Sequence, residues 1–188
     1  RKGNLISLPV HIDGDGKIDM ISENSSSNTI SIFKNTSTPG SLSFAPKIDY
    51  ATGSNPVAVS VADIDGDGKL DVAVINYISK TVSVFKNTST SGIISFALKV
   101  DYTTGNGPYG IAIAGIVGDG KPDIGIVNYD GNTVSILKNS SIIGTISFAP
   151  KVDYTTGTGP NSIFITDIDV DSKPYLAIPT YDPHTIPI

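Results

Sequence analysis

Short runs of alternating apolar and polar residues recur along the chain at a constant distance. Residues Pro56–Ala62 place three valines on one face, which is the period of two that is typical of a β-strand. Similar runs at Val72–Tyr77, Thr81–Lys86 and Ile94–Tyr102 predict three further strands, each separated from the last by turn residues. Because each connection is a turn or a loop, we predict that the four strands form one antiparallel sheet in hairpin order.

This pattern is one copy of a repeat. Phe44, Phe96 and Phe148 stand 52 residues apart, with no insertion between copies. The same distance separates other series of one residue type: Lys34, Lys86 and Lys138; Gly53, Gly105 and Gly157; Pro56, Pro108 and Pro160; Asp15, Asp67, Asp119 and Asp171. The copies fall at approximately 4–55, 56–107, 108–159 and 160–188 of a single segment, 1–188. The last copy is incomplete, because its fourth strand is missing and prolines interrupt its second and third.

The first two strands of each copy are apolar on nearly both faces, which indicates a sheet packed between two neighbours. Four-stranded sheets stacked radially form a β-propeller, whose repeats are typically about 40–50 residues long. A β-solenoid coil is usually shorter, and a separate sandwich of this size would be too small to stand without staples. We therefore predict an all-β fold, a β-propeller segment in which four blades are present and the last is incomplete.

A loop rich in aspartate joins the first two strands of each copy. In the second copy, Asp63–Asp71 (DIDGDGKLD) places carboxylates at positions 1, 3, 5 and 9 and can turn a backbone carbonyl inward at position 7. These oxygens, with water, supply the roughly six to eight ligands that Ca²⁺ takes. The candidate ligands are Asp63, Asp65, Asp67, Asp71 and the carbonyl of Lys69. An EF-hand is excluded, because it needs glutamate at position 12, where this chain has Val74.

The other three loops carry fewer carboxylates in the same register. They hold Asp13, Asp15 and Asp19 in copy one, Asp119 and Asp123 in copy three, and Asp167, Asp169 and Asp171 in copy four. Twelve of the seventeen aspartates lie in the four loops, which is more than turn formation requires, and without a cation they would repel one another. We expect calcium affinity to fall from copy two to copies one and four, and then to copy three.

Composition argues against several functional classes. The chain of 188 residues has no cysteine, so disulfides and cysteine–zinc sites are impossible. Its net charge of −5 argues against nucleic acid and against a basic membrane-binding patch. No apolar run is long enough for a transmembrane helix. The two histidines lie far apart in the repeat, and no hydrolase, metalloprotease or phosphate-loop motif is present, so we do not expect an enzyme.

Two further series in the repeat each allow two interpretations. Four asparagines open Asn-x-Ser/Thr sequons that could carry glycans, although the same residues are ordinary turn formers: Asn24, Asn35, Asn87 and Asn139. Tyrosines recur in two registers, Tyr50, Tyr102 and Tyr154 in one and Tyr77, Tyr129 and Tyr181 in the other. We expect the tyrosines to cover blade edges, with sugar stacking as the alternative.

The aspartate loop between two short strands resembles the loop of FG-GAP/VCBS repeats. Phe-Ala-Pro at Phe44–Pro46 and Phe148–Pro150 and Gly-x-x-Pro at Gly105–Pro108 are similar to that family as well. The resemblance, which covers nearly the whole chain, implies a propeller that usually has seven blades, with calcium in these loops. It carries over to all four aspartates of Asp63–Asp71, in part to copies one and four, and least to copy three. The number of copies departs from the family, since there are four in place of seven.

The resemblance and the loops together imply an extracellular, calcium-stabilised module for adhesion, or for binding a protein or a glycan. Extracellular calcium modules bind at roughly 10⁻⁴–10⁻³ M, which suits a site that fills outside the cell. The alternative is a structural subunit of a self-assembling surface filament or ring, in which neighbouring chains complete the open blades. A fragment of a longer propeller and a closed four-bladed monomer also stay open.

Overall fold

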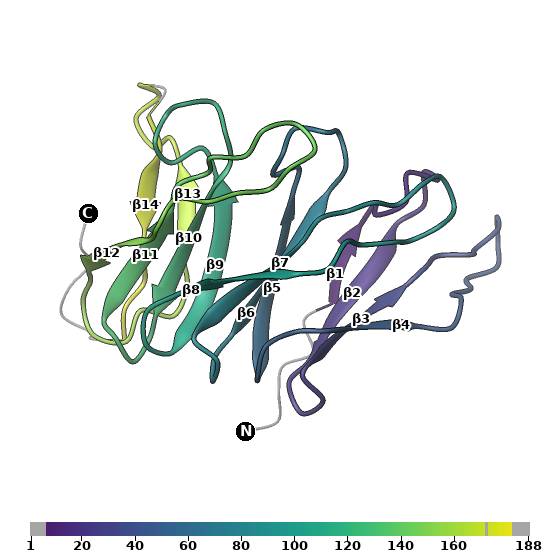
Figure 1. Cartoon of the computed structure of the whole chain (residues 1–188), viewed down its shortest axis with the longest axis horizontal. Coiled ribbons are helices and arrows are strands. Elements are labelled where there is room, and N and C mark those ends of the chain that lie inside the picture. Colours follow the sequence, from purple (N-terminus) through teal and green to yellow (C-terminus); the bar gives the residue numbers. More distant parts are fainter. Residues whose placement is uncertain (1–6, 172, 182–188) are drawn as a thin grey trace.

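The computed structural model describes residues 7–171 and 173–181, and every regular element in them is a β-strand (Figure 1). The first sheet contains β1 (Ser7–Val10), β2 (Asp19–Asn24), β3 (Thr29–Phe33) and β4 (Ile48–Ala51). The second contains β5 (Pro56–Ala62), β6 (Asp71–Asn76), β7 (Thr81–Phe85) and β8 (Val100–Thr103). The third contains β9 (Pro108–Ala114), β10 (Asp123–Asn128), β11 (Thr133–Leu137) and β12 (Val152–Thr155), and the pair β13 (Phe164–Thr166) and β14 (Tyr175–Ala177) follows. The predicted all-β class is confirmed.

Strands pair antiparallel and in sequence order within each four-stranded sheet, as the hairpin pattern predicts. The registers also repeat from one sheet to the next. Val61 lies opposite Val72 in the second sheet, and the residues 52 positions later, Ile113 and Ile124, lie opposite each other in the third. The structural repeat is therefore the four-stranded sheet.

The fourth strand is shorter than the sequence predicts. Alternation predicts a strand over Ile94–Tyr102, whereas β8 begins only at Val100. Phe96 still pairs with Asn87 in an isolated bridge, but its register is shifted by one residue from the pairing of Val84 with Val100, so the strand is not continuous. The predicted third strand of the last copy falls in residues 182–188, outside the described residues.

The second strand of a four-stranded sheet buries both of its faces. In β6, Val72 and Val74 pack against the first sheet, whereas Ala73 and Ile75 pack against the third, and all four side chains are fully buried. The prediction of a sheet packed between two neighbours is confirmed. Burying one valine or isoleucine side chain contributes about 1.5–3 kcal/mol, so burial of these side chains stabilises the packing of one sheet on the next.

The sheets stand side by side in sequence order, with β1–β4 and β13–β14 at opposite ends of the series (Figure 1). Strands near the start of each copy supply the contacts between sheets: β2 lies against β5, β5 against β9, and β9 against β13. Within residues 7–171 and 173–181 the two ends do not meet, so the series stays open. In that same part of the chain, no helix could span a membrane.

The connectors between sheets depend on glycine at one position. The Gly105 amide donates to Oδ1 of the buried Asn128 (3.0 Å), and a Cβ on Gly105 would lie 2.5 Å from Nδ2 of the same side chain. We expect Gly105→Ala to lower the free energy of unfolding by about 1–3 kcal/mol, because Asn128 is held by other hydrogen bonds and cannot move away. Urea denaturation followed by circular dichroism measures the change.

Gly115→Ala is the matched control for this substitution. Gly115 also lies outside the strands, and a Cβ there would meet only the Lys121 carbonyl at 3.5 Å, an ordinary contact. Its effect should stay within about 0.5 kcal/mol. Equal effects of the two substitutions would show that the close approach of Gly105 to Asn128 is not what requires glycine.

Candidate metal centre

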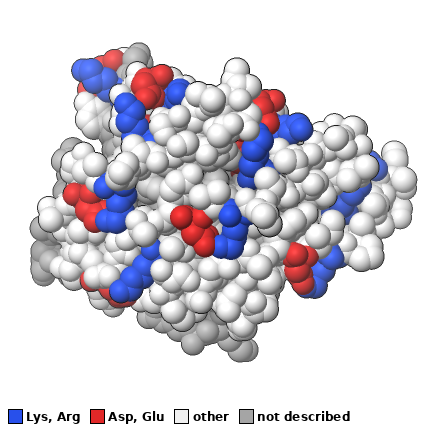
Figure 2. Space-filling view, in the orientation of Figure 1, with Lys and Arg blue, Asp and Glu red and all other residues white. Residues whose placement is uncertain are grey.

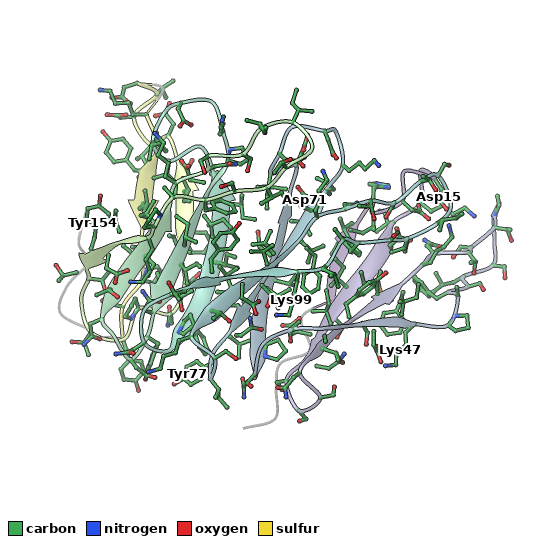
Figure 3. The ribbon with its side chains drawn as sticks, viewed as in Figure 1. Asp15, Lys47, Asp71, Tyr77, Lys99 and Tyr154 are labelled. Carbon is green, nitrogen blue, oxygen red and sulfur yellow. The ribbon has the colours of Figure 1, made fainter. Side chains whose placement is uncertain are left out.

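The aspartate loops lie at one end of the sheets. Asp15 and Asp71, from the first and second loops, are found toward the same end, and Tyr77, which follows β6, lies toward the opposite end (Figure 3). This placement follows from the strand order, because each loop joins the end of a first strand to the start of a second strand. The candidate ligands of successive copies therefore lie in a row along one face of the array.

The aspartate at position 9 closes its loop through backbone amides. Asp71 is fully buried, its Oδ2 accepts the Ile64 amide (3.0 Å), and its Oδ1 accepts the Asn87 amide (2.8 Å). Burial raises the pKa of Asp71 to about 6, although the two amide donors act to lower it. The corresponding Asp19 and Asp123 are equally buried and accept equivalent amides. This carboxylate therefore has a structural role in copies one, two and three.

Three carboxylates of the second loop converge. Asp63, Asp65 and Asp71 each present an oxygen, and these oxygens lie within 4.8 Å of one another. Asp63 is held in place because it accepts the amides of Gly66, Asp67 and Gly68 at 2.9–3.1 Å. The cluster could hold a metal ion, and an all-carboxylate donor set fits a hard cation such as calcium. The predicted ligands Asp63, Asp65 and Asp71 are thus brought together.

The fourth predicted carboxylate of this loop, Asp67, does not join that cluster. Its Oδ1 accepts the Lys69 amide (3.0 Å), and its Oδ2 accepts the ammonium of Lys86 (2.7 Å), which also donates to Asp65. Burial acts to lower the pKa of Lys86, but the hydrogen bonds that it donates to Asp65 and Asp67 outweigh burial and raise it. Sequence reasoning missed Lys86 as part of the site. The available signal was its series with Lys34 and Lys138, which has the same spacing as the aspartates.

The fourth loop also brings three carboxylates together, Asp167, Asp169 and Asp171, and all three are exposed. Tyr175 stands where the other loops have the buried aspartate, and its hydroxyl donates to Asp169 (3.0 Å). Val170 has a φ of 64° at the position where the other loops have glycine. A β-branched residue is strained in that region, so this loop is the less well built of the two clusters.

The first and third loops contain no comparable group of three within the part of the chain that the structure describes. In the first loop, Lys34 donates to both Asp13 and Asp15, and Nδ1 of His11 lies 3.0 Å from the Lys17 carbonyl, at position 7 of that loop. In the third loop, Asp119 is exposed and lies 3.3 Å from the ammonium of Lys138.

Two of the four candidate glycosylation sites are unsuitable. Nδ2 of the fully buried Asn87 donates to the Leu70 carbonyl and to the Ile12 carbonyl of the first sheet, both at 2.9 Å. Asn139, 1% exposed, bridges the third sheet to the Ile64 carbonyl of the second in the same way. Nδ2 of each of these two asparagines therefore connects neighbouring sheets, and a glycan on that nitrogen would not fit this packing. Nδ2 of Asn35 donates to the Ile18 carbonyl of its own sheet (2.9 Å), and Nδ2 of Asn24 donates to the hydroxyls of Thr29 and Ser31.

The first tyrosine register covers the contacts between sheets. Tyr50 of the first sheet meets the ring of Phe96 at 5.2 Å between centroids, and Tyr102 meets Phe148 at 5.1 Å. Burial raises the pKa of both tyrosines. Tyr154 has the same register but is 57% exposed, and it lines an apolar groove of about 480 Å³ beside β14.

In the second register, Tyr77 donates to Asp130 (2.7 Å), the ring centroid of Tyr129 stands 5.9 Å from that of Tyr109, and Tyr181 is 76% exposed.

Aspartates on the fourth strands have a structural partner in each sheet. Asp101 accepts the hydroxyl of Ser83 (2.6 Å) and the ammonium of Lys99, and Ser83 in turn accepts from Asn76 (2.8 Å). The surface reflects such pairs, since most acidic patches adjoin basic ones on the face shown in Figure 2. On that face the charges form no extended patch of one sign.

Residues 11–74 match the FG-GAP-like repeat family, and this segment begins at the first residue of the first aspartate loop and ends within β6. It therefore contains the whole of the first and second loops, including the cluster of Asp63, Asp65 and Asp71. No curated protein matches the chain. Residues 11–74 of this chain are thus similar to FG-GAP-like repeats.

Proposed function

We propose that this chain is a segment of a β-propeller in which each four-stranded sheet is one blade. In a propeller, the strands nearest the axis bring successive blades together, and here β2, β5, β9 and β13 supply the contacts between sheets. The repeated registers and the burial of β6 on both faces support the same arrangement. The incomplete β13–β14 sheet takes the place of a fourth blade.

The aspartate loops bind calcium, and the second loop binds it most tightly. The observation that carries this proposal is the convergence of Asp63, Asp65 and Asp71, whose oxygens lie within 4.8 Å of one another. A flexible loop of carboxylates suits the variable coordination of calcium better than the strict octahedron of magnesium. Calcium in this position ties β5 to β6, so part of its binding free energy stabilises the fold.

The segment works by binding a protein or a glycan outside the cell and not by catalysis. Support for binding comes from the match of residues 11–74 to FG-GAP-like repeats and from exposed tyrosines such as Tyr109. Tyr109 is 42% exposed and lies at the start of β9, the end of that strand away from its aspartate loop. Support for an extracellular location comes from the affinity of such modules, roughly 10⁻⁴–10⁻³ M, which matches calcium outside cells.

A calcium titration of the full chain by isothermal calorimetry tests the metal proposal. We expect binding of Ca²⁺ in preference to Mg²⁺, and a loss of at least about tenfold in affinity at the tightest site in Asp63→Asn, which removes one negative charge from the cluster. Asp119→Asn is the control, because Asp119 lies at position 5 of the third loop, outside both clusters. Unchanged calcium affinity in Asp63→Asn would contradict the assignment.

Self-assembly into a filament or ring is a second candidate, because the end sheets expose positions that the inner sheets bury. Leu42 in the first sheet is 80% exposed, whereas Ile94, the same position in the second sheet, is 8% exposed in the interface. The groove beside Tyr154 lies at the other end of the series. Light scattering in millimolar calcium separates the two functions: a monomer favours recognition, and a particle that grows with concentration favours assembly.

A further inference from the structure

A lysine from the third strand reaches into the aspartate loop of its own sheet. Lys86 follows β7, and its ammonium donates to Oδ2 of Asp65 and to Oδ2 of Asp67 at 2.7 Å. In the first sheet, Lys34 contacts Asp13 and Asp15 in the same way. Both lysine side chains are 22% exposed, and the side chains of Asp65 and Asp13 are fully buried. The geometry is therefore a repeated arrangement and not a chance surface pair.

The charges of the second loop explain why such a cation is needed. Asp63, Asp65, Asp67 and Asp71 bring four carboxylates into one nine-residue loop. Backbone amides satisfy many of their lone pairs but neutralise no charge, so the remaining repulsion would favour opening of the hairpin. A buried carboxylate such as Asp65 is especially costly without a positive partner. Among the described residues, Lys86 is the cation that is hydrogen-bonded to this loop's carboxylates.

We propose that Lys86 is the resident cation of the second loop in the absence of calcium, and that it sets calcium affinity by competing for Asp65 and Asp67. This inference rests on the calcium site proposed above. Asp65 is the shared group, since it belongs to the converging cluster and also accepts the ammonium. A calcium ion at the cluster would stand close to the ammonium, and the two positive charges would repel. Calcium binding therefore displaces Lys86 from Asp65.

The first and third loops contain the same kind of contact between a lysine and an aspartate, and they differ in how firmly the lysine is held. Lys34 donates a further hydrogen bond to the Gly92 carbonyl of the second sheet (2.6 Å), so displacing it also breaks a contact between sheets. Lys138 lies 3.3 Å from Asp119 and is 54% exposed, so it is held least firmly. Lysine therefore competes with calcium most strongly in the first loop. That loop should need a higher calcium concentration to bind the ion than the second loop does.

Lys86→Met tests the inference, because methionine keeps the approximate length of the side chain and removes the charge. We expect calcium affinity of the full chain, measured by calorimetry, to rise about tenfold, since the competing cation is gone. In EDTA, the urea midpoint of the same variant should fall, because the loop loses its resident cation. Calcium should then raise that midpoint more in the variant than in the unsubstituted protein.

Lys99→Met is the matched control. Lys99 pairs with Asp101 beside β8, and its side chain is 24% exposed, close to the value for Lys86, but it does not contact an aspartate loop. Its substitution should leave calcium affinity unchanged. If Lys86→Met bound calcium no more tightly than the unsubstituted protein, the proposed role of Lys86 would be overturned, and the proposed metal site would not. Absence of calcium binding in both proteins would instead overturn the proposed metal site.

Discussion

Asn87→Ala is expected to lower the free energy of unfolding by about 3 kcal/mol. The side chain is fully buried, and its Nδ2 donates to Leu70 in its own sheet and to Ile12 in the preceding sheet, while its Oδ1 accepts the Ser89 amide (2.8 Å). Alanine removes the hydrogen-bond partner of the Ile12 and Leu70 carbonyls and of the Ser89 amide, and the first and last of these groups are buried. An unsatisfied buried group costs about 1–3 kcal/mol, with partial relaxation reducing the sum. Urea denaturation of the two proteins measures the difference.

Asn35→Ala is the control for this prediction, because Asn35 holds the same repeat position in the first sheet. Its Nδ2 donates to one carbonyl, that of Ile18, and the side chain is only half-buried. We expect a loss of about 1 kcal/mol. If the two substitutions cost the same, the hydrogen bond from Asn87 to Ile12 does not contribute to holding the first two sheets together.

Asp123→Ala should destabilise the protein by about 3 kcal/mol, with or without calcium. The buried carboxylate accepts the amides of Ile116 (2.9 Å), Val117 (3.0 Å) and Asn139 (2.8 Å). Bonds to a charged acceptor contribute about 1.5–3 kcal/mol each, and the exposed end of the loop can recover part of the loss by hydration. Thermal and urea unfolding in EDTA and in calcium measure the effect.

The third loop suits this experiment because its carboxylates do not form a cluster of three among the described residues. Asp119→Ala in the same loop is the control, since Asp119 is exposed and accepts only the Lys121 amide (3.2 Å) besides its pair with Lys138. Its cost should stay below about 1 kcal/mol. A destabilisation by Asp123→Ala that vanished in EDTA would show that position 9 acts through calcium and not through the amides.

The sequence alone predicts the strands and loops of this protein because its pattern is local and repeated. Alternation in Pro56–Ala62 places β5 with both bounds correct, and the 52-residue spacing transfers that assignment to β9. The predicted start of Ile94–Tyr102 is wrong, because the continuous strand begins only at Val100. Phe96 pairs with Asn87 in a register shifted by one residue from the pairing of Val84 with Val100, so the ladder is broken between them. Alternation shows which face a residue lies on, and it does not show such a shift of register.

The partners of the site residues were harder to predict, because they come from distant parts of the chain. Asn87 and Ile12 are 75 residues apart, and their contact depends on the packing of one sheet on another. Lys86 and Asp65 are 21 residues apart and meet only because β7 returns beside β6. The sequence supplied the residue types at the candidate metal centre. The division of its carboxylates between a metal cluster and a lysine needed the three-dimensional arrangement.

The side-by-side order of the sheets determines which parts of the protein unfold locally most often. Each sheet packs on its immediate neighbours. Its stability is therefore close to the sum of its own intrinsic free energy of unfolding and one free-energy contribution from each interface. The second sheet has two complete interfaces, whereas the first has one described interface and the third has one complete interface, with the second sheet, and a smaller one with the short β13–β14 pair. Fluctuations that expose backbone amides therefore begin at the ends and reach the centre last. The second loop, with the best-formed carboxylate cluster, belongs to the sheet that opens least often.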